Sequence, residues 1–249
     1  MGLTVLILAG SRAEGDPLAL HEGLPAKALI ELDGQPMLSR VVAAVRAAGA
    51  DRIAVSASHP EVAALAEALG CEVLPARSGP SESAAEAFRH FGAPMLLTTA
   101  DHALLDPQWV RFLAEAHPIG ADLSVLLARR ETIEQAAPGT RRTYLRLADG
   151  HWSGCNLFYL ATPAAGAALD LWRQVESDRK RPWRIAARLG PGFLLRYLFG
   201  RLTMRDAIAR LGRLARLRAE VVESPFGLAA VDVDKPADLA LVRTLIARP

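Results

Sequence analysis

The chain has 249 residues and a mass of 26.7 kDa, a length that a single α/β domain can occupy. Hydrophobic residues make up 51% of it and aromatic residues 6%, so aliphatic side chains must fill the core. Two cysteines, Cys71 and Cys155, exclude a disulfide framework and a cysteine-based zinc site. The sequence shows neither a membrane-spanning apolar run nor a basic leader, so we expect a cytoplasmic protein.

The net charge of +2 conceals an uneven distribution of charged residues. Residues 173–218 contain 13 Lys and Arg against 3 Asp and Glu, a local charge of +10, which leaves the rest of the chain at −8. A basic segment on an acidic body favours an anionic partner for that segment. No recognised nucleic-acid-binding motif is present, so we do not expect this partner to be a nucleic acid.

Strands and helices are predicted to alternate along the first half of the chain. Apolar runs predict strands at 3–8, 28–32, 52–56, 71–75 and 94–99. Helical spacing and terminal prolines and glycines predict helices at 36–48, 60–69, 81–91 and 107–116. This alternation is typical of a Rossmann-like α/β fold, a mostly parallel sheet flanked by helices. Such sheets bind ligands beyond the carboxyl ends of their strands.

The second half is less regular but shows no repeat and no linker. Strands are predicted at 123–128, 143–147, 155–160, 219–223 and 229–232. Helices are predicted at 163–174, 184–217 and 236–247, the second of them interrupted at 190–192 and at Gly200. We therefore expect a single domain, 1–249, with a basic helical insert at 173–218.

The segment Leu8-Ala9-Gly10-Ser11-Arg12 directly follows the first predicted strand. A glycine at this point lets backbone N–H groups approach a phosphate, and an arginine pairs well with phosphate oxygens. Lys27 is a second cation for the same site. The alternative is a tight strand-exit loop with solvated charges. The segment matches neither the phosphate loop with a Gly-Lys ending nor the dinucleotide fingerprint.

Carboxylates follow two predicted strands near their ends. Asp101 ends the strand at 94–99, and because the next helix begins near Asp106, its carboxylate is left free. Asp232 and Asp234 lie after a late strand; we interpret Asp234 as the cap of the final helix, which leaves Asp232 as a second metal ligand. Carboxylates with water and phosphate are the ligands that Mg²⁺ prefers.

In their order, these motifs resemble the MobA-like nucleotidyltransferases, which have a GT-A-type fold. The matching segments are Leu8-Ala9-Gly10 with Arg12 and Lys27 downstream, Thr99-Ala100-Asp101-His102, Ser153-Gly154-Cys155-Asn156, and 232–239. The resemblance covers 3–128 well and 153–160 and 229–246 less completely, and it leaves out 173–218. It implies transfer of a nucleoside monophosphate from CTP or GTP to a small phosphorylated acceptor, with Mg²⁺ as cofactor and release of pyrophosphate.

The resemblance also implies roles for individual positions. The catalytic residues would be Arg12, Lys27, Asp101 and Asp232, of which the two aspartates would hold Mg²⁺. The nucleotide-binding residues would be Leu8, Ala9, Gly10, Ser11, Gly79, Ser81 and Ser83. On the acceptor side the resemblance implies Gly154 and Asn156, to which the basic insert adds Arg179 and Lys180. The family usually has a second glycine where Ser11 stands, and the loop that follows is longer here.

The basic insert and the general activity each have alternatives. Arginines beside phenylalanines and leucines are typical of a helix packed on the sheet with a solvated basic face, or of a surface for a lipid-linked acceptor. The second interpretation predicts peripheral membrane contact through 179–218. For the activity, the alternatives are a GT-A glycosyltransferase and an inactive nucleotide-binding scaffold. The sequence Asp101-His102-Ala103 lacks the second aspartate that the glycosyltransferase motif requires.

Overall fold

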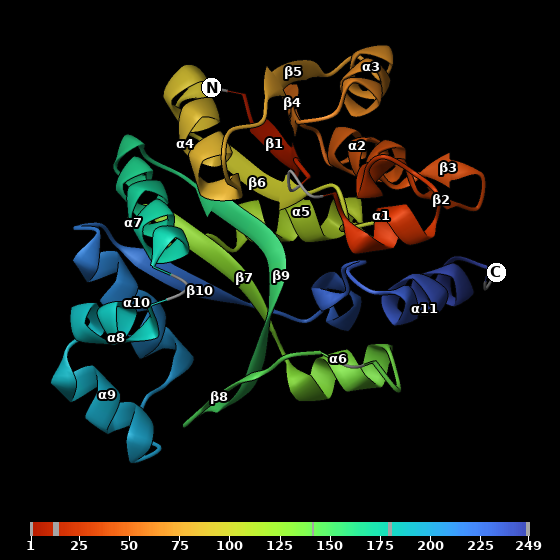
Figure 1. Cartoon of the computed structure of the whole chain (residues 1–249). Coiled ribbons are helices and arrows are strands. Elements are labelled where there is room, and N and C mark those ends of the chain that lie inside the picture. Colours follow the sequence, from red (N-terminus) through yellow and green to blue (C-terminus); the bar gives the residue numbers. More distant parts are fainter. Residues whose placement is uncertain (1, 12–14, 141, 179–180, 248–249) are drawn as a thin grey trace.

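The computed structural model describes residues 2–11, 15–140, 142–178 and 181–247 (Figure 1). The strands are β1 Thr4–Ala9, β2 Glu31–Leu32, β3 Gln35–Pro36, β4 Arg52–Ala57, β5 Glu72–Pro75, β6 Met95–Thr99, β7 Leu123–Arg129, β8 Leu145–Leu147, β9 Gly150–Leu160 and β10 Ala219–Ser224. The α-helices are α1 Pro17–His21, α2 Met37–Ala47, α3 Pro60–Ala68, α4 Pro80–Phe91, α5 Pro107–Glu115, α6 Arg130–Ala136, α7 Gly166–Ser177, α8 Pro182–Leu189, α9 Pro191–Leu198, α10 Met204–Leu214 and α11 Pro236–Ile246.

One large sheet runs in the order β10-β7-β9-β6-β1-β4-β5, with β8 paired to β9. Strands β6, β1, β4 and β5 pair in parallel, as do β7 and β10. Strand β9 runs antiparallel to β6, β7 and β8, and it joins the two parallel groups. The prediction of a mostly parallel α/β sheet is therefore confirmed.

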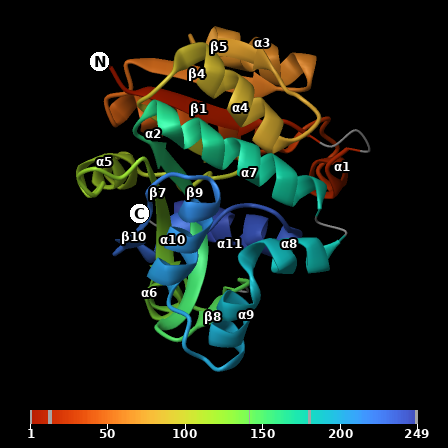
Figure 2. The same ribbon diagram turned by 90° about the vertical axis from the view of Figure 1, so that its left-hand side faces the viewer.

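Helices cover both faces of the sheet (Figures 1 and 2). On one face α4 and α7 pack together over β1 and β6, where Leu6, Phe88 and Leu169 belong to one buried cluster. On the other face, a larger cluster joins residues of α2, α3 and α5 to the sheet, among them Val41, Val62 and Val110. The inner parallel strands β1, β4 and β6 are buried on both sides, which explains their largely apolar sequences.

The strand predicted at 229–232 is wrong, and the strand predicted at 28–32 is confirmed only at Glu31 and Leu32. Residues Lys27–Leu29 form a 3-10 turn, and the chain then folds back at Asp33 as the short hairpin β2-β3. Residues Gly227–Ala230 form a second 3-10 turn rather than a strand. In both stretches the apolar side chains belong to buried hydrophobic clusters, although the backbone of these turns does not pair with the main sheet.

Two short helices were not predicted, whereas two predicted helix interruptions are confirmed. The short helices α1 and α6 fall in stretches for which no helix was predicted, and Asp16 caps α1 by accepting from Leu18 N at 2.9 Å. The helical stretch 184–217 is divided into α8, α9 and α10 as expected, with turns at Gly190 and Gly200 where φ is 88° and 61°. In the described part of the chain, no helix combines the length and apolarity needed to cross a bilayer.

Candidate functional site

A cleft of about 1230 Å³ opens at the carboxyl ends of β1 and β6. Its lining includes ten residues that the sequence singled out: Leu8, Ala9, Gly10, Ser11, Lys27, Gly79, Ser81, Ser83, Asp101 and Asn156. Gly154 and Asp232 are not among the lining residues, and Gly154 is exposed on β9. Arg12, Arg179 and Lys180 lie outside the described residues. The roles assigned to all of these positions stay predictions.

The chain leaves β1 through a close packing of backbone against a neighbouring loop. A Cβ atom at Gly10 would lie 3.3 Å from that of Ala76, so a larger residue would crowd the loop after β5. The next N–H group, that of Ser11, donates to Ser58 Oγ at 2.8 Å. Glycine at this position therefore permits the close approach between the end of β1 and the loop after β5.

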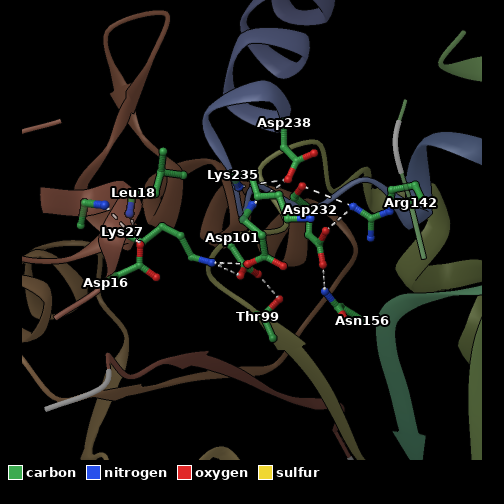
Figure 3. Close-up of polar contacts among 12 residues, drawn as sticks. Asp16, Leu18, Lys27, Thr99, Asp101, Arg142, Asn156, Asp232, Lys235 and Asp238 are labelled. Carbon is green, nitrogen blue, oxygen red and sulfur yellow. Dashed lines mark hydrogen bonds and ion pairs between the residues drawn. The ribbon is translucent and has the colours of Figure 1, made fainter. Parts of the chain in front are cut away.

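Lys27 joins two segments that are far apart in the sequence, and it does so inside this cleft. Its ammonium donates to Asp101 Oδ2 at 2.7 Å and to Asp234 Oδ1 at 2.6 Å. Thr99 Oγ1 donates to the other oxygen of Asp101 (Figure 3). Asp234 comes within reach of Lys27 because Val233 N donates to Asp101 O at 3.0 Å. This hydrogen bond holds the chain after residue 231 against the end of β6.

Asp232 points to a different set of partners. Arg142 donates to its Oδ1, and Asn156 Nδ2 donates to its Oδ2 at 2.7 Å (Figure 3). The Arg142 and Asp232 side chains are only 12% and 13% exposed. Lys27 and Arg142 thus divide three aspartates between them, Lys27 taking Asp101 and Asp234 and Arg142 taking Asp232.

The interpretation of Asp234 as a helix cap is wrong. Asp238, in the first turn of α11, accepts from Asp234 N at 3.2 Å and from Lys235 N at 3.0 Å. Lys235 is the N-cap residue of α11, and Asp238 at the third helical position accepts from its N–H, as the acidic residue of a capping box does. The carboxylate of Asp234 is left to face the cleft, where it is 56% exposed and contacts Lys27.

The pKa values in the site follow from burial and from these pairs. Burial alone would lower the pKa of Lys27, but the charges of Asp101 and Asp234 outweigh it and raise that pKa above its ordinary value. Burial raises the pKa of Asp101, and the Lys27 ammonium opposes the rise. Burial would also raise the pKa of Asp232, but hydrogen bonding to Arg142 and its charge hold it below the ordinary value.

The donor set fits a magnesium ion. Two carboxylates, those of Asp101 and Asp234, already converge on a single cationic atom, Lys27 Nζ. The described residues contain no group of three or more acidic, His or Cys side chains that could hold a metal by themselves. Mg²⁺ is commonly held by one or two carboxylates while water and substrate phosphates supply its remaining ligands. A site of this kind would be completed by a bound triphosphate.

The loop before α4 forms a second wall of the cleft, and α7 reaches across to it. Glu176 accepts from Ser81 N at 3.3 Å and from the Ser81 hydroxyl. A Cβ atom at Gly79 would lie 2.7 Å from Glu176 Oε1, so the glycine permits this approach. The amino end of α4 therefore already receives a carboxylate, as its helix dipole favours. A nucleotide that reaches Gly79 and Ser81 would meet Glu176.

His102 follows Asp101 in the sequence but serves the core. It is fully buried, its ring lies 5.7 Å from that of Trp109, and it does not line the cleft. Burial lowers the pKa of His102 to about 4, so the ring is neutral at pH 7.

Sequence reasoning missed Arg142, Glu176 and the position of Asp234. Arg142 precedes β8 in an irregular segment, and a single charged residue there carries no pattern. Glu176 belongs to α7, where the spacing of the apolar residues predicts a helix but gives no indication that Glu176 contacts the cleft. Asp234 had a signal, since Asp232 and Asp234 alternate along one extended segment, but the bond from Lys235 N to Asp238 at the start of α11 was overlooked.

We predict that Arg142→Ala lowers stability in a pH-dependent manner. The lowered pKa of Asp232 stabilises the fold above about pH 4, the ordinary carboxyl value, and this contribution is lost as the pH falls through the folded value. Because the variant leaves a mostly buried carboxylate without its cation, its unfolding free energy at pH 7 should drop by about 2 kcal/mol.

Urea unfolding at neutral and at acidic pH measures this effect, and the difference from wild type should shrink in acid. Arg130→Ala is the matched control, because it removes an exposed pair with Glu134 and should change stability by less than about 1 kcal/mol. A deficit for Arg142→Ala that is the same at both pH values would show that Asp232 is not the group responsible.

Comparison with known proteins shows the family to which the chain belongs. The sequence model described as MobA-like NTP transferase domain matches residues 5–219. The 3-deoxy-manno-octulosonate cytidylyltransferase of Serratia proteamaculans is 34% identical over 99 residues, 37% of this chain and 40% of that protein. Its counterpart in Yersinia pseudotuberculosis is 33% identical over 99 residues, again 37% of this chain and 40% of that protein. The matches thus span about two fifths of these curated relatives.

Solved structures extend the likeness over the whole chain. A structure described as a hypothetical transferase from Thermus thermophilus is 32% identical, with a TM-score of 0.82, over 96% of this chain and 100% of its own. The structure of CMP:2-keto-3-deoxy-manno-octonic acid synthetase complexed with CTP is 18% identical, with a TM-score of 0.57, over 100% and 99%. At that identity the second likeness shows a shared fold alone.

Proposed function

The chain belongs to the MobA-like NTP transferase family, and on this premise we propose that it transfers a cytidylyl group from CTP to a small phosphorylated acceptor. The observation that carries the proposal is the convergence of Asp101 and Asp234 on one cationic atom in the cleft after β1 and β6. This arrangement offers a cation site where a parallel sheet binds its ligands. The glycosyltransferase alternative has no support in the family match.

For the metal we propose Asp101 with Asp234, in place of the pair of Asp101 and Asp232 expected from the sequence. Asp234 lines the cleft, whereas Asp232 does not, and both of its oxygens are engaged by Arg142 and Asn156. When bound, Mg²⁺ would offset negative charge on the phosphates of the nucleotide. Asp232 would act indirectly, by holding Arg142 and Asn156 in place.

The remaining chemistry asks for position and charge rather than covalent help. An acceptor phosphate oxygen attacks the α-phosphorus, and the bond to the β-phosphate oxygen breaks, so that its electron pair leaves with pyrophosphate. Lys27 would offset the charge on that leaving group, with Arg12 as the expected second cation. The backbone N–H of Gly10 would contact the triphosphate, and that of Ser11 would join it by exchanging its bond to Ser58 Oγ for a phosphate oxygen.

Two observations support the choice of substrates. The relatives that share over 30% identity in the aligned part are cytidylyltransferases, which favours CTP over GTP. The described residues that line the cleft include no histidine and no cysteine, so no general base of these types faces the acceptor. A phosphate acceptor needs none, because its attacking oxygen is already anionic. A sugar acid such as 3-deoxy-manno-octulosonate is the second candidate, by likeness to the same relatives.

The test begins with the donor and proceeds to the acceptor. Thermal unfolding with ATP, GTP, CTP and UTP, each with Mg²⁺ or with EDTA, should show the largest Mg²⁺-dependent rise for CTP. Pyrophosphate release from CTP would then be measured with sugar phosphates and with 3-deoxy-manno-octulosonate. Binding of CTP without pyrophosphate release from any acceptor would favour an inactive scaffold, and a larger rise with GTP would overturn the choice of base.

A further inference from the structure

The helix α9 exposes apolar side chains on a part of the molecule remote from the cleft. None of the residues Pro191–Leu198 is buried. Leu198 and the following Phe199 are 75% and 72% exposed, and Leu195 and Tyr197 are about half exposed. Single exposed apolar residues are ordinary. Four of them within five consecutive positions form an apolar patch, and such patches are typical of interaction surfaces.

The backbone presents this patch as a separate arm. Gly190 and Gly200 both adopt positive φ, so the chain turns sharply before and after α9. Figure 2 shows α9 below α8 and α10, at the opposite end of the molecule from α3 and β5. The arm follows α7, whose last turn lines the cleft with Glu176 and Ser177.

Most of the charged residues around the arm are arginines. Arg201 and Arg205 are exposed, and in the described part of the chain neither has a carboxylate within ion-pair distance. Arg196 pairs with Asp206, which is the only acidic residue of the stretch 183–218. The patch is therefore apolar at its centre and cationic at its border.

We propose that this surface, formed by Leu195, Tyr197, Leu198 and Phe199 with Arg201 and Arg205, docks on an anionic lipid bilayer. Apolar side chains enter the boundary between headgroups and acyl chains, while arginines remain with the lipid phosphates. A second copy of the chain is a poorer occupant. In a symmetric pair the same residues face one another, so the arginines of the two copies would repel. The inference goes beyond nucleotidyl transfer and does not depend on it.

The test is sedimentation of the whole protein with vesicles. Phosphatidylcholine vesicles with about one third phosphatidylglycerol should bind it, pure phosphatidylcholine vesicles should bind it much less, and added salt should reverse the binding. Arg201→Ala with Arg205→Ala should weaken binding by about 5-fold for each arginine removed. Leu198→Ser with Phe199→Ser should weaken it by at least about tenfold even at low salt.

Matched controls come from exposed residues elsewhere. Ile119→Ser removes an apolar side chain that is 97% exposed, and Arg89→Ala removes an exposed arginine on α4; both should bind like wild type. Circular dichroism checks that the α9 variants remain folded, as they should, because no side chain of that helix is buried.

Three results would overturn the proposal. They are absence of binding to the anionic vesicles, equal binding of the α9 variants and wild type, and a concentration-dependent dimer, seen by light scattering, that Leu198→Ser with Phe199→Ser dissociates. The last result would identify a second copy as the occupant.

Discussion

Asp101→Asn should reduce the rate of pyrophosphate release by about 10³-fold at saturating CTP and acceptor. The substitution keeps the shape of the side chain and an oxygen that can accept from Thr99, so it removes little besides the charge. That charge stands at the carboxyl end of β6, where Lys27 already binds it at 2.7 Å. Without it, we expect the Mg²⁺-dependent thermal shift with CTP to become small or absent, which gives a measurement independent of turnover.

Asp106→Asn is the control for this substitution. Asp106 lies five residues further on and accepts from Gln108 N at 2.7 Å as the cap of α5. Its change should cost no more than about 1 kcal/mol of stability and leave the rate unaltered. Retention of the wild-type rate within a few-fold in Asp101→Asn would remove Asp101 from the proposed mechanism.

The second large effect separates the two candidate metal ligands near the end of the chain. Asp234→Asn should lower the rate by about 10²-fold or more and raise the Mg²⁺ concentration needed for half-maximal activity. Asp232→Asn should leave the Mg²⁺ requirement close to that of wild type, because Asp232 does not line the cleft. It should instead lower stability, since it leaves Arg142 mostly buried and without its anion.

Titration of activity against Mg²⁺ and urea unfolding of both variants provide the comparison. Each variant thereby serves as the control of the other, because the two aspartates are two positions apart and differ in their partners. The reverse pattern, with the Mg²⁺ requirement raised by Asp232→Asn and unchanged by Asp234→Asn, would restore the pair of Asp101 and Asp232.

The sequence predicted the parallel half of the molecule well because its signals there are local. Strands β1, β4 and β6 are largely buried on both faces and have mostly apolar sequences, and Gly49 and Gly70 end the helices before β4 and β5. The same reasoning placed Lys27 and Asp101 at one edge, because strand ends of a parallel sheet share that edge. It did not anticipate that β9 runs antiparallel between the two parallel groups.

Contacts between distant segments account for what the sequence could not supply. The apolar residues Ile30 and Val231 resembled strand residues. Both instead belong to one buried cluster that includes residues of α11 and lies outside the sheet. Arg142 meets Asp232 across 90 positions, and Glu176 meets Ser81 across 95. No spacing rule covers such pairs, since they depend on how loops and helices come together after the sheet has formed.

The bridge at Lys27 also sets the order in which the site is completed during synthesis. Lys27 and Asp101 are 74 positions apart and belong to the half that is made first, whereas Asp234 lies 207 positions beyond Lys27. A nascent chain that has folded β1, β4, β5 and β6 can pair Lys27 with Asp101 alone. The second carboxylate arrives only when the segment at Val233 docks on Asp101. Translation must therefore have passed Asp234 before the proposed magnesium nucleotide site exists, and a chain released before that point lacks one of the two anionic ligands.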